Sequence, residues 1–309
     1  MLIKNPPVEI ADGLTMLGTN EYPIYLVRSG NEGALFEGGV GAIGPVVAEQ
    51  IAELGIAADV VKQIIVTHAH PDHVMAVPAF RSLFTEATVC ASEAAAGTLL
   101  VEKAVGFFTK IDGMLTAALI KAGSVTEQHR PQPLSENRIP IDRTLSEGDT
   151  VTVGDLTFTC LATPGHSDDS LSFHEPDRGI LIISDATGYY IPESEYFWPN
   201  YFSDYGAYLE SIRRLTNLDA DIVCLSHNAV IKGDKAIRSY FDKATVAAES
   251  WHARIIQAVE DQGKGTDVIA AELGAEVYKK TQLLDVKFFQ KNCEQLVKQS
   301  VKYADKNSE

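Results

Sequence analysis

The stretch THAHPDH, residues 67–73, follows directly on the apolar run IIV and contains three of the eight histidines of the chain. An apolar run that ends in polar residues is typical of a buried strand leading into a loop, and α/β folds place their chemistry on such loops. Side chains two residues apart on an extended stretch share a face, so His68 and His70 can bind one metal ion. Asp72 and His73 can then bind a second ion, because imidazole and carboxylate suit zinc, iron and manganese.

Three further strand ends carry the same kinds of side chain. His166 follows the strand in TCLATPGH, His227 follows the strand in IVCLSH, and Asp185 closes the apolar run in GILIISD. An aspartate at the end of a run of isoleucine and leucine is costly to desolvate without a partner, and a metal cation is the natural one. We interpret the isolated histidines as structural: His129, His174 and His252.

The motifs THAHPDH, TPGHSDDS, SDATG and LSHN resemble the ordered metal motifs of the metallo-β-lactamase superfamily. The resemblance covers about residues 12–95 and 140–230. It implies an αββα sandwich with the metal ions at one edge of the two sheets. Carried over position by position, it implies one ion held by His68, His70 and His166, a second held by Asp72, His73 and His227, and Asp185 bridging the two.

The activity that the resemblance implies is hydrolysis by a hydroxide bound between two divalent cations, which lower the pKa of the shared water toward 7. We expect Asp72 to be catalytic as well as a ligand. Zinc is the metal we expect, with iron and manganese as alternatives. Glu37, Ser184 and Ser226 are expected to support and orient the metal-binding residues.

The aspartate at position 185 indicates a branch of the family. Glyoxalase II-like thioesterases, acyl-homoserine lactonases and alkylquinolone-pathway thioesterases keep a bridging aspartate there, whereas secreted zinc β-lactamases do not. Classical glyoxalase II has a Gly-Cys-Gly-Arg segment soon afterwards, where this chain has an aromatic-rich one at 189–208. The sequence therefore predicts an ester or thioester hydrolase acting on an acyl-CoA-like substrate. The alternatives are a lactonase, a phosphodiesterase, or a non-catalytic effector that retains the metal site.

Helical patterns interrupt and follow the metal motifs. Alternating strand and helix patterns predict an α/β fold, with a catalytic domain at 1–230 that contains a helical insertion at about 92–135. Two helices are expected within 92–125, separated near Asp112-Gly113. A helical C-terminal extension at 231–309 is expected to pack on this domain. The resemblance implies that both sets of helices roof the metals and shape an acyl or aromatic pocket.

Composition and net charge restrict the classes of binding partner that we expect. The formal net charge is −16 and the pI is near 4.9, so phosphate backbones and anionic lipid are repelled, and no nucleic acid or membrane partner is expected. The four cysteines are far apart, and the N-terminal segment has no apolar signal sequence, so a cytoplasmic location is expected. The expected partner is a small-molecule acyl substrate, and a homodimer is left open.

Lysines four residues apart in the last predicted helix form pairs on one helix face, for example Lys287 and Lys291. They are candidates for binding the phosphates of a CoA-type substrate. The alternative is that they form the solvated side of an amphipathic helix.

Overall fold

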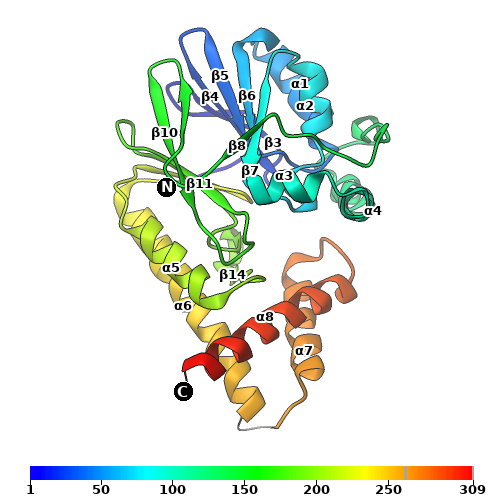
Figure 1. The fold of residues 1–309 in the computed structure, drawn as a ribbon, viewed down its shortest axis with the longest axis vertical. Helices are drawn as coiled ribbons and strands as arrows, with labels where there is room; N and C mark the ends of the chain where they lie inside the picture. The colour runs from blue at the N-terminus through cyan, green and yellow to red at the C-terminus, as the bar shows by residue number, and fades with distance from the viewer. Residues whose placement is uncertain (261–262, 308–309) are drawn as a thin grey trace.

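Two seven-stranded sheets form the centre of the computed structural model, which describes residues 1–260 and 263–307 (Figure 1). The first sheet has the order β2 (Val8–Ala11), β3 (Leu14–Gly18), β4 (Pro23–Ser29), β5 (Glu32–Phe36), β6 (Val61–Ile65), β7 (Thr88–Ser92), β8 (Arg143–Leu145). The second has the order β1 (Leu2–Ile3), β16 (Val230–Lys232), β15 (Ile222–Leu225), β12 (Ile180–Ser184), β11 (Leu171–Glu175), β10 (Leu156–Ala162), β9 (Thr150–Val153). Neighbours β5 to β8 are parallel, as are β12 and β15.

Helices flank the two sheets and follow them at the C-terminal end (Figure 1). They are α1 (Ile43–Glu53), α2 (Val77–Leu83), α3 (Glu93–Leu99), α4 (Glu102–Ala122), α5 (Tyr205–Thr216), α6 (Asp234–Glu260), α7 (Thr266–Thr281) and α8 (Val286–Asn307). Short 3-10 turns are η1 (Ala58–Val60), η2 (Pro71–His73), η3 (Glu127–His129) and η4 (Pro192–Ser194), and a small hairpin is formed by β13 (Tyr189–Ile191) and β14 (Tyr196–Trp198). Helices α1 to α4 lie on the side of the first sheet, and α5 and α6 lie on the side of the second (Figure 1).

The inner faces of the two sheets meet in an apolar core. Phe36 of the first sheet contacts Phe158 and Phe173 of the second, with ring centroids 5.0 and 5.2 Å apart. All three rings are fully buried, and burial of apolar surface at about 25 cal/mol per Å² is what holds two such sheets together. The predicted αββα sandwich is therefore confirmed.

The predicted helix boundary at Asp112-Gly113 is wrong. Helix α4 runs unbroken from 102 to 122, and the interruption between α3 and α4 lies at Leu100 and Val101. The Asp112 side chain, which suggested a helix end, points inward and accepts a hydrogen bond from the backbone nitrogen of Gly41 at 2.6 Å. Gly113 is exposed, so it weakens the helix without breaking it.

The C-terminal helices form a separate layer below the sandwich in Figure 1. The long helix α6 leads away from the sheets, and α7 and α8 then fold back against each other. Gly274 permits their close approach, because a Cβ there would lie 2.4 Å from the backbone of Gln290. Residues 263–265 lie between α6 and α7 and residues 282–285 between α7 and α8, while the last two residues of the predicted extension, 308–309, lie outside the described ranges.

The last strand of the sandwich, β16, ends at Lys232, just past the predicted start of the helical extension. In the described ranges, no helix is both long enough and apolar enough to cross a bilayer.

Candidate metal centre

Loops at the ends of strands from both sheets bring the predicted metal-binding residues together at one edge of the sandwich. The first sheet supplies four of them after β6, and the second sheet supplies three, after β10, β12 and β15. They are His68, His70, Asp72 and His73, followed by His166, Asp185 and His227. Three groups among them hold their ligand atoms within 4.8 Å of one another: His68, His70 and His166; His68, His73 and Asp185; Asp72, His73 and His227.

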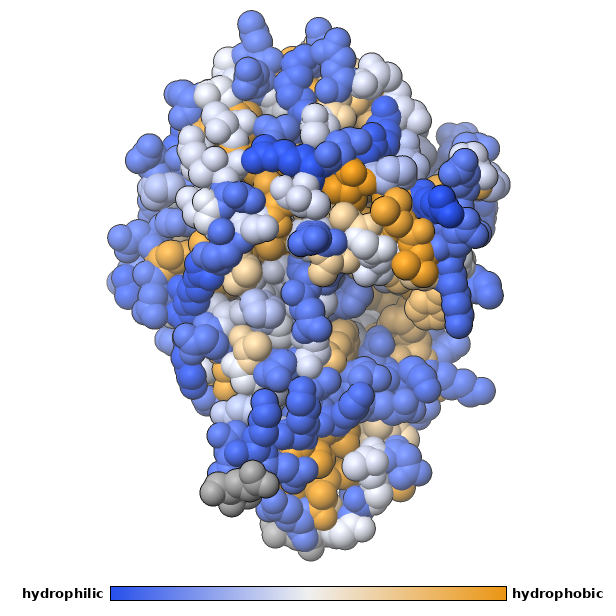
Figure 2. Space-filling view, viewed as in Figure 1, coloured by the Kyte–Doolittle hydropathy of each residue, from blue (hydrophilic) through white to orange (hydrophobic). Residues whose placement is uncertain are grey.

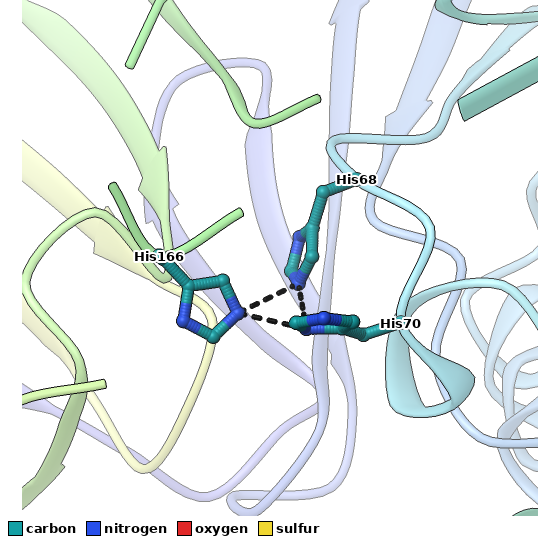
Figure 3. Close-up of side chains that lie close together, drawn as sticks. All are labelled: His68, His70 and His166. Carbon is teal, nitrogen blue, oxygen red and sulfur yellow. Dashed lines mark hydrogen bonds between the residues drawn. The ribbon is translucent and has the colours of Figure 1, made fainter. Parts of the chain in front are cut away.

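The tightest group contains three imidazoles (Figure 3). Nε2 of His68 lies 3.1 Å from Nδ1 of His70, and Nε2 of His166 lies 3.2 and 2.8 Å from these two atoms. Tetrahedral zinc with Zn–N bonds of 2.0–2.1 Å requires nitrogens about 3.3 Å apart. The three nitrogens thus form one face of a tetrahedron of nearly the size that zinc needs.

The second group is built around Asp185. Its Oδ1 lies 3.3 Å from Nε2 of His227, and its Oδ2 lies 3.3 Å from Nε2 of His166 and 3.7 Å from Nε2 of His73. One carboxylate therefore faces both groups, as a bridging ligand must. Asp72 completes the second group, because its Oδ2 is 3.6 Å from Nε2 of His73 and 3.8 Å from Nε2 of His227.

A cation fits the chemistry of these donors. Nε2 of His73 is buried and has no hydrogen-bond partner among the described residues. Buried polar atoms are nearly always paired, and a metal ion would satisfy this one. The arrangement therefore fits a dinuclear site of histidine and aspartate ligands.

The opposite ring nitrogens are held from outside the cluster. Each of four histidines presents Nδ1 to an oxygen and so keeps Nε2 aimed inward, which is how proteins orient metal-binding imidazoles. The contacts are His68 to Ser184 Oγ (3.2 Å), His73 to Glu37 Oε2 (2.8 Å), His166 to the Asn200 carbonyl (2.8 Å) and His227 to the Glu21 carbonyl (2.7 Å). Ser226 Oγ donates to Asp185 Oδ1, so the predicted orienting roles of Glu37, Ser184 and Ser226 match their positions.

Three supporting residues were not found from the sequence. Glu21 and Asn200 act through backbone carbonyls, which every residue type possesses, so no side-chain signal marks them. Asp169 accepts a hydrogen bond from the backbone nitrogen of Ala69 at 2.7 Å and so ties the loop of His166 to that of His68. The sequence feature that could have identified Asp169 is its carboxylate in the motif HSDDS, close to His166.

Burial and neighbouring charges together set the protonation of the cluster. Burial lowers the pKa of His166 to about 4 and holds the pKa of His68 well below its usual range. Burial also disfavours the charged form of His73, but the carboxylates around it, Asp72 first, outweigh that effect and raise its pKa to about 10. Although burial alone would raise the pKa of Asp185, His227 and the other histidines hold it well below its usual range. At neutral pH the cluster thus combines an ionised Asp185 with neutral imidazoles at His68 and His166, which are the forms that bind metals, whereas His73 is protonated and would have to release its proton on binding one.

A cavity of about 250 Å³ opens over the cluster. Apolar side chains from α4 and from the α7–α8 region roof it, and Figure 2 shows recessed apolar surface between the sandwich and the C-terminal helices. Those roofing residues are Phe107, Phe108, Ile111 and Leu115 with Leu283, Leu284, Phe288 and Phe289. The expectation that both sets of helices roof the site therefore agrees with the structure.

The aromatic segment after Asp185 divides into two sets. Of its aromatic side chains, Tyr189, Trp198 and Phe202 line the cavity, and Asn200 of the same segment lines it as well. The others pack outside it, for example Tyr201 and Tyr208, which are fully buried in the core.

Lys287 and Lys291 are exposed and do not line the cavity. Lys291 also pairs with Glu294 at 3.2 Å, which favours the interpretation of these lysines as the solvated side of an amphipathic helix.

The isolated histidines make local contacts away from the cluster. His174 contacts the carbonyl of Asp219 at 2.9 Å, and Nδ1 of His129 accepts from the backbone nitrogen of Thr126 at 2.9 Å. His252 stacks on the ring of Tyr205 with centroids 4.2 Å apart.

Comparison with known proteins agrees with this architecture. A metallo-β-lactamase family protein from Thermus thermophilus superposes with a TM-score of 0.65 at 21% identity, covering 97% of this chain and 95% of that one. The metallo-β-lactamase of Cronobacter sakazakii with the HARLDQ motif superposes with a TM-score of 0.57 at 19% identity, covering 82% of this chain and 98% of that one. These likenesses concern the fold.

Two curated relatives are hydroxyacylglutathione hydrolases. The one from Cereibacter sphaeroides is 29% identical over 124 residues, which make up 40% of this chain and 33% of that protein. The one from Erythrobacter litoralis is 37% identical over 46 residues, or 15% of this chain and 18% of that protein. The chain thus matches a third or less of the length of these relatives.

The family model described as the metallo-beta-lactamase superfamily matches residues 18–227, a range that contains all seven of the residues gathered at the sandwich edge. With this match over most of its length, the chain belongs to the metallo-beta-lactamase superfamily.

Proposed function

We propose that the protein is a metal-dependent hydrolase that cleaves esters or thioesters of apolar acyl groups. The observation that carries the proposal is the cavity: the histidine and aspartate cluster lies against a lining that is otherwise mainly aromatic and aliphatic. Among the described residues that line it, there is no lysine or arginine. A phosphodiester, whose charge calls for cationic side chains, fits this lining less well than a neutral acyl group does.

Seven residues are the ligands in this proposal. One ion would be held by His68, His70 and His166, a second by Asp72, His73 and His227, and Asp185 would contact both. When bound, two such ions would lower the pKa of a water and polarise the scissile carbonyl. Zinc is the ion that the imidazole-rich first group favours, and iron and manganese also suit these donors.

Side chains of the protein would carry out the proton transfer and bind the acyl chain. Asp72 faces the cavity, with 26% of its side chain exposed, so its carboxylate can bind a metal through one oxygen and accept a proton from water through the other. In the reaction, the water oxygen forms a bond to the acyl carbon and the carbon–sulfur or carbon–oxygen bond breaks. The leaving thiol or alcohol takes up the proton. The apolar roof holds the acyl chain and limits access of bulk water to the reacting carbonyl.

A substrate panel tests the proposal. The full chain, stripped with a chelator and reloaded separately with zinc, manganese or iron, is assayed on octanoyl-N-acetylcysteamine, octanoyl-CoA, an octanoic lactone and bis-p-nitrophenyl phosphate. We expect metal-dependent release of thiol from the thioesters. His68→Ala should abolish it, whereas His174→Ala, a histidine of the second sheet outside the cluster, should retain it. Turnover of the diester alone, or thioester turnover that survives removal of the metal, would overturn the proposal; cleavage of the lactone alone would make the protein a lactonase instead.

A further inference from the structure

A buried chain of hydrogen bonds joins His68 and His73, two histidines that the proposed function assigns to different ions. Nδ1 of His68 lies 3.2 Å from Ser184 Oγ, and Ser184 Oγ lies 2.8 Å from Thr67 Oγ1. Thr67 Oγ1 donates to Oε2 of Glu37 at 2.9 Å, and the same Oε2 lies 2.8 Å from Nδ1 of His73. Thr67 Oγ1 also lies 3.4 Å from Nδ1 of His68, a longer contact along the same path. One carboxylate oxygen is therefore connected to both histidines.

The members of this chain are shielded from solvent. Thr67 and His68 are fully buried, and Glu37, Ser184 and His73 are each 2% exposed. Buried hydroxyl groups and imidazoles in native proteins nearly always have hydrogen-bond partners, so these groups must share their protons with one another. Oε1 of Glu37 has no partner among the described residues, so the carboxylate acts on the chain through Oε2.

The direction of each hydrogen bond follows from the carboxylate. A carboxylate oxygen only accepts, so Thr67 uses its single proton to donate to Glu37. The Thr67 oxygen can then only accept from Ser184, and the Ser184 oxygen in turn only accepts from His68. His68 must therefore carry its proton on Nδ1, which leaves the Nε2 lone pair facing the cluster. The reverse assignment would place two hydroxyl oxygens 2.8 Å apart with no proton between them.

Two members of the chain have unusual backbone conformations. Glu37 and Ser184 have φ angles of 80° and 46°, in the left-handed region that residues other than glycine seldom adopt. Such a conformation is unfavourable and persists where the surrounding structure requires it. Glu37 follows β5 of the first sheet and Ser184 ends β12 of the second, so the strained residues are those that carry the chain from one sheet to the other.

We propose that Oε2 of Glu37 determines which ring nitrogen of both His68 and His73 is available to a metal ion. It acts on His73 directly and on His68 through the hydroxyls of Thr67 and Ser184. Thr67 and Ser184 are positioning residues, because they act through His68 and are not among the residues that could hold an ion. Both ion positions then depend on one side chain. The inference rests on the metal site of the proposed function.

Histidine ring ¹⁵N NMR of the metal-free full chain at pH 7.5 tests the inference. We expect the Nδ1–H tautomer for His68 in the unaltered chain. Thr67→Val keeps the shape of the side chain but removes the hydroxyl between Ser184 and Glu37. The Ser184 hydroxyl then has no acceptor left in the chain except Nδ1 of His68, so this variant should shift His68 toward the Nε2–H tautomer. The Nδ1 signal of His73 should stay the same, because His73 contacts Glu37 directly.

Zinc affinity, measured by competition with a chelator, gives a second readout. Thr67→Val should weaken zinc binding about tenfold, because the His68 tautomer must be reversed before Nε2 can bind the ion. Thr67→Ser retains the hydroxyl and should match the unaltered chain in both readouts. Thr67→Ala removes the hydroxyl with less change in packing than an altered shape would cause, and it should behave like Thr67→Val.

Thr163→Val is the matched control. Thr163 is 1% exposed and its Oγ1 lies 2.9 Å from Ser172 Oγ, so this variant also breaks a buried threonine–serine hydrogen bond, but one outside the chain to Glu37. It should keep the Nδ1–H tautomer of His68 and the zinc affinity of the unaltered chain.

An Nδ1–H tautomer for His68 in both Thr67→Val and Thr67→Ala would overturn the inference. So would a loss of zinc affinity in Thr67→Ser as large as that in Thr67→Val, because shape rather than the hydroxyl would then be responsible. Neither readout needs turnover. A failure to hydrolyse any thioester would therefore refute the proposed function, while the tautomer of His68 still decides the role of Glu37 and Thr67.

Discussion

The carboxylate oxygen Oε2 of Glu37 lies 2.8 Å from Nδ1 of His73, and both side chains are only 2% exposed. Glu37 directly follows β5 with a left-handed backbone, φ 80°, and its Oε2 also accepts from Thr67 Oγ1 at 2.9 Å. Its backbone nitrogen donates to the carbonyl of Ile65 at 3.0 Å. Glu37 thus joins the ends of two adjacent parallel strands to the turn that carries His73.

Replacing this carboxylate should weaken metal binding without unfolding the protein. Glu37→Gln keeps the shape of the side chain but removes the charge that orients and polarises His73, and loss of such outer partners typically costs about 10–100-fold in metal affinity. Competition between the protein and a zinc chelator measures the change. Glu49→Gln, an exposed glutamate of α1, is the control and should bind zinc like the unaltered chain. Unchanged affinity in Glu37→Gln would show that His73 is oriented without this contact.

Asp185 should determine the number of bound ions. Its two oxygens face different histidines at 3.3 Å, so Asp185→Asn removes the one negative charge shared by both groups. We expect elemental analysis to give about two equivalents of metal for the unaltered chain and about one for the variant. Asp177→Asn, an exposed aspartate in the turn after β11, should retain both. Two tightly held ions in Asp185→Asn would contradict a bridging role.

The roof should set the preferred acyl length. Phe108 and Phe289 are 8% and 2% exposed and line the cavity from different helices, so truncating either one to alanine enlarges it. We expect kcat/KM to shift toward longer acyl thioesters with metal content unchanged. The substitution should also cost about 3–5 kcal/mol of stability, as for other buried phenylalanines. Phe84→Ala, a buried ring of the first-sheet layer outside the cavity, should lose stability but keep the original length preference.

Asp112 should make stability depend on pH. Burial raises its pKa to about 6, above the value of about 3.9 in an unfolded chain. The folded protein therefore binds this proton more tightly, and the contribution to stability is present below about pH 4 and is lost as the pH rises through 6. A shift of about two pH units corresponds to at most about 3 kcal/mol.

Asp112→Asn removes the ionisable group and can still accept from the Gly41 nitrogen. Urea unfolding of the chelator-treated protein should show the variant to be more stable than the unaltered chain at pH 7.5 and about equal to it at pH 4. Asp242→Asn, which removes an exposed charge from α6, should show no such difference between the two pH values. A stability gain that is the same at both pH values would exclude titration of Asp112 as its cause.

The sequence by itself determined the α/β class and the candidate ligands through short-range patterns, and the resemblance carried by its metal motifs implied the sandwich. Apolar runs that end in histidine or aspartate mark strand ends, and His68, His70, Asp72 and His73 lie within six residues. The hairpin turn at Gly154 is equally local, since Gly154 adopts φ 59° and Val153 pairs with Leu156 across it.

Only the tertiary structure decided how the site is enclosed and held. The local sequence at Asp112-Gly113 is typical of a helix end. In the structure the helix is continuous there, because the Asp112 carboxylate accepts a hydrogen bond from the backbone nitrogen of Gly41, 71 residues away. The carbonyls of Glu21 and Asn200 orient two histidines without any side-chain signature. Phe289 reaches the metal edge because α7 and α8 fold back toward it. These contacts join residues far apart in the chain through backbone atoms and close packing. Local sequence patterns do not indicate which distant residue a buried group will contact.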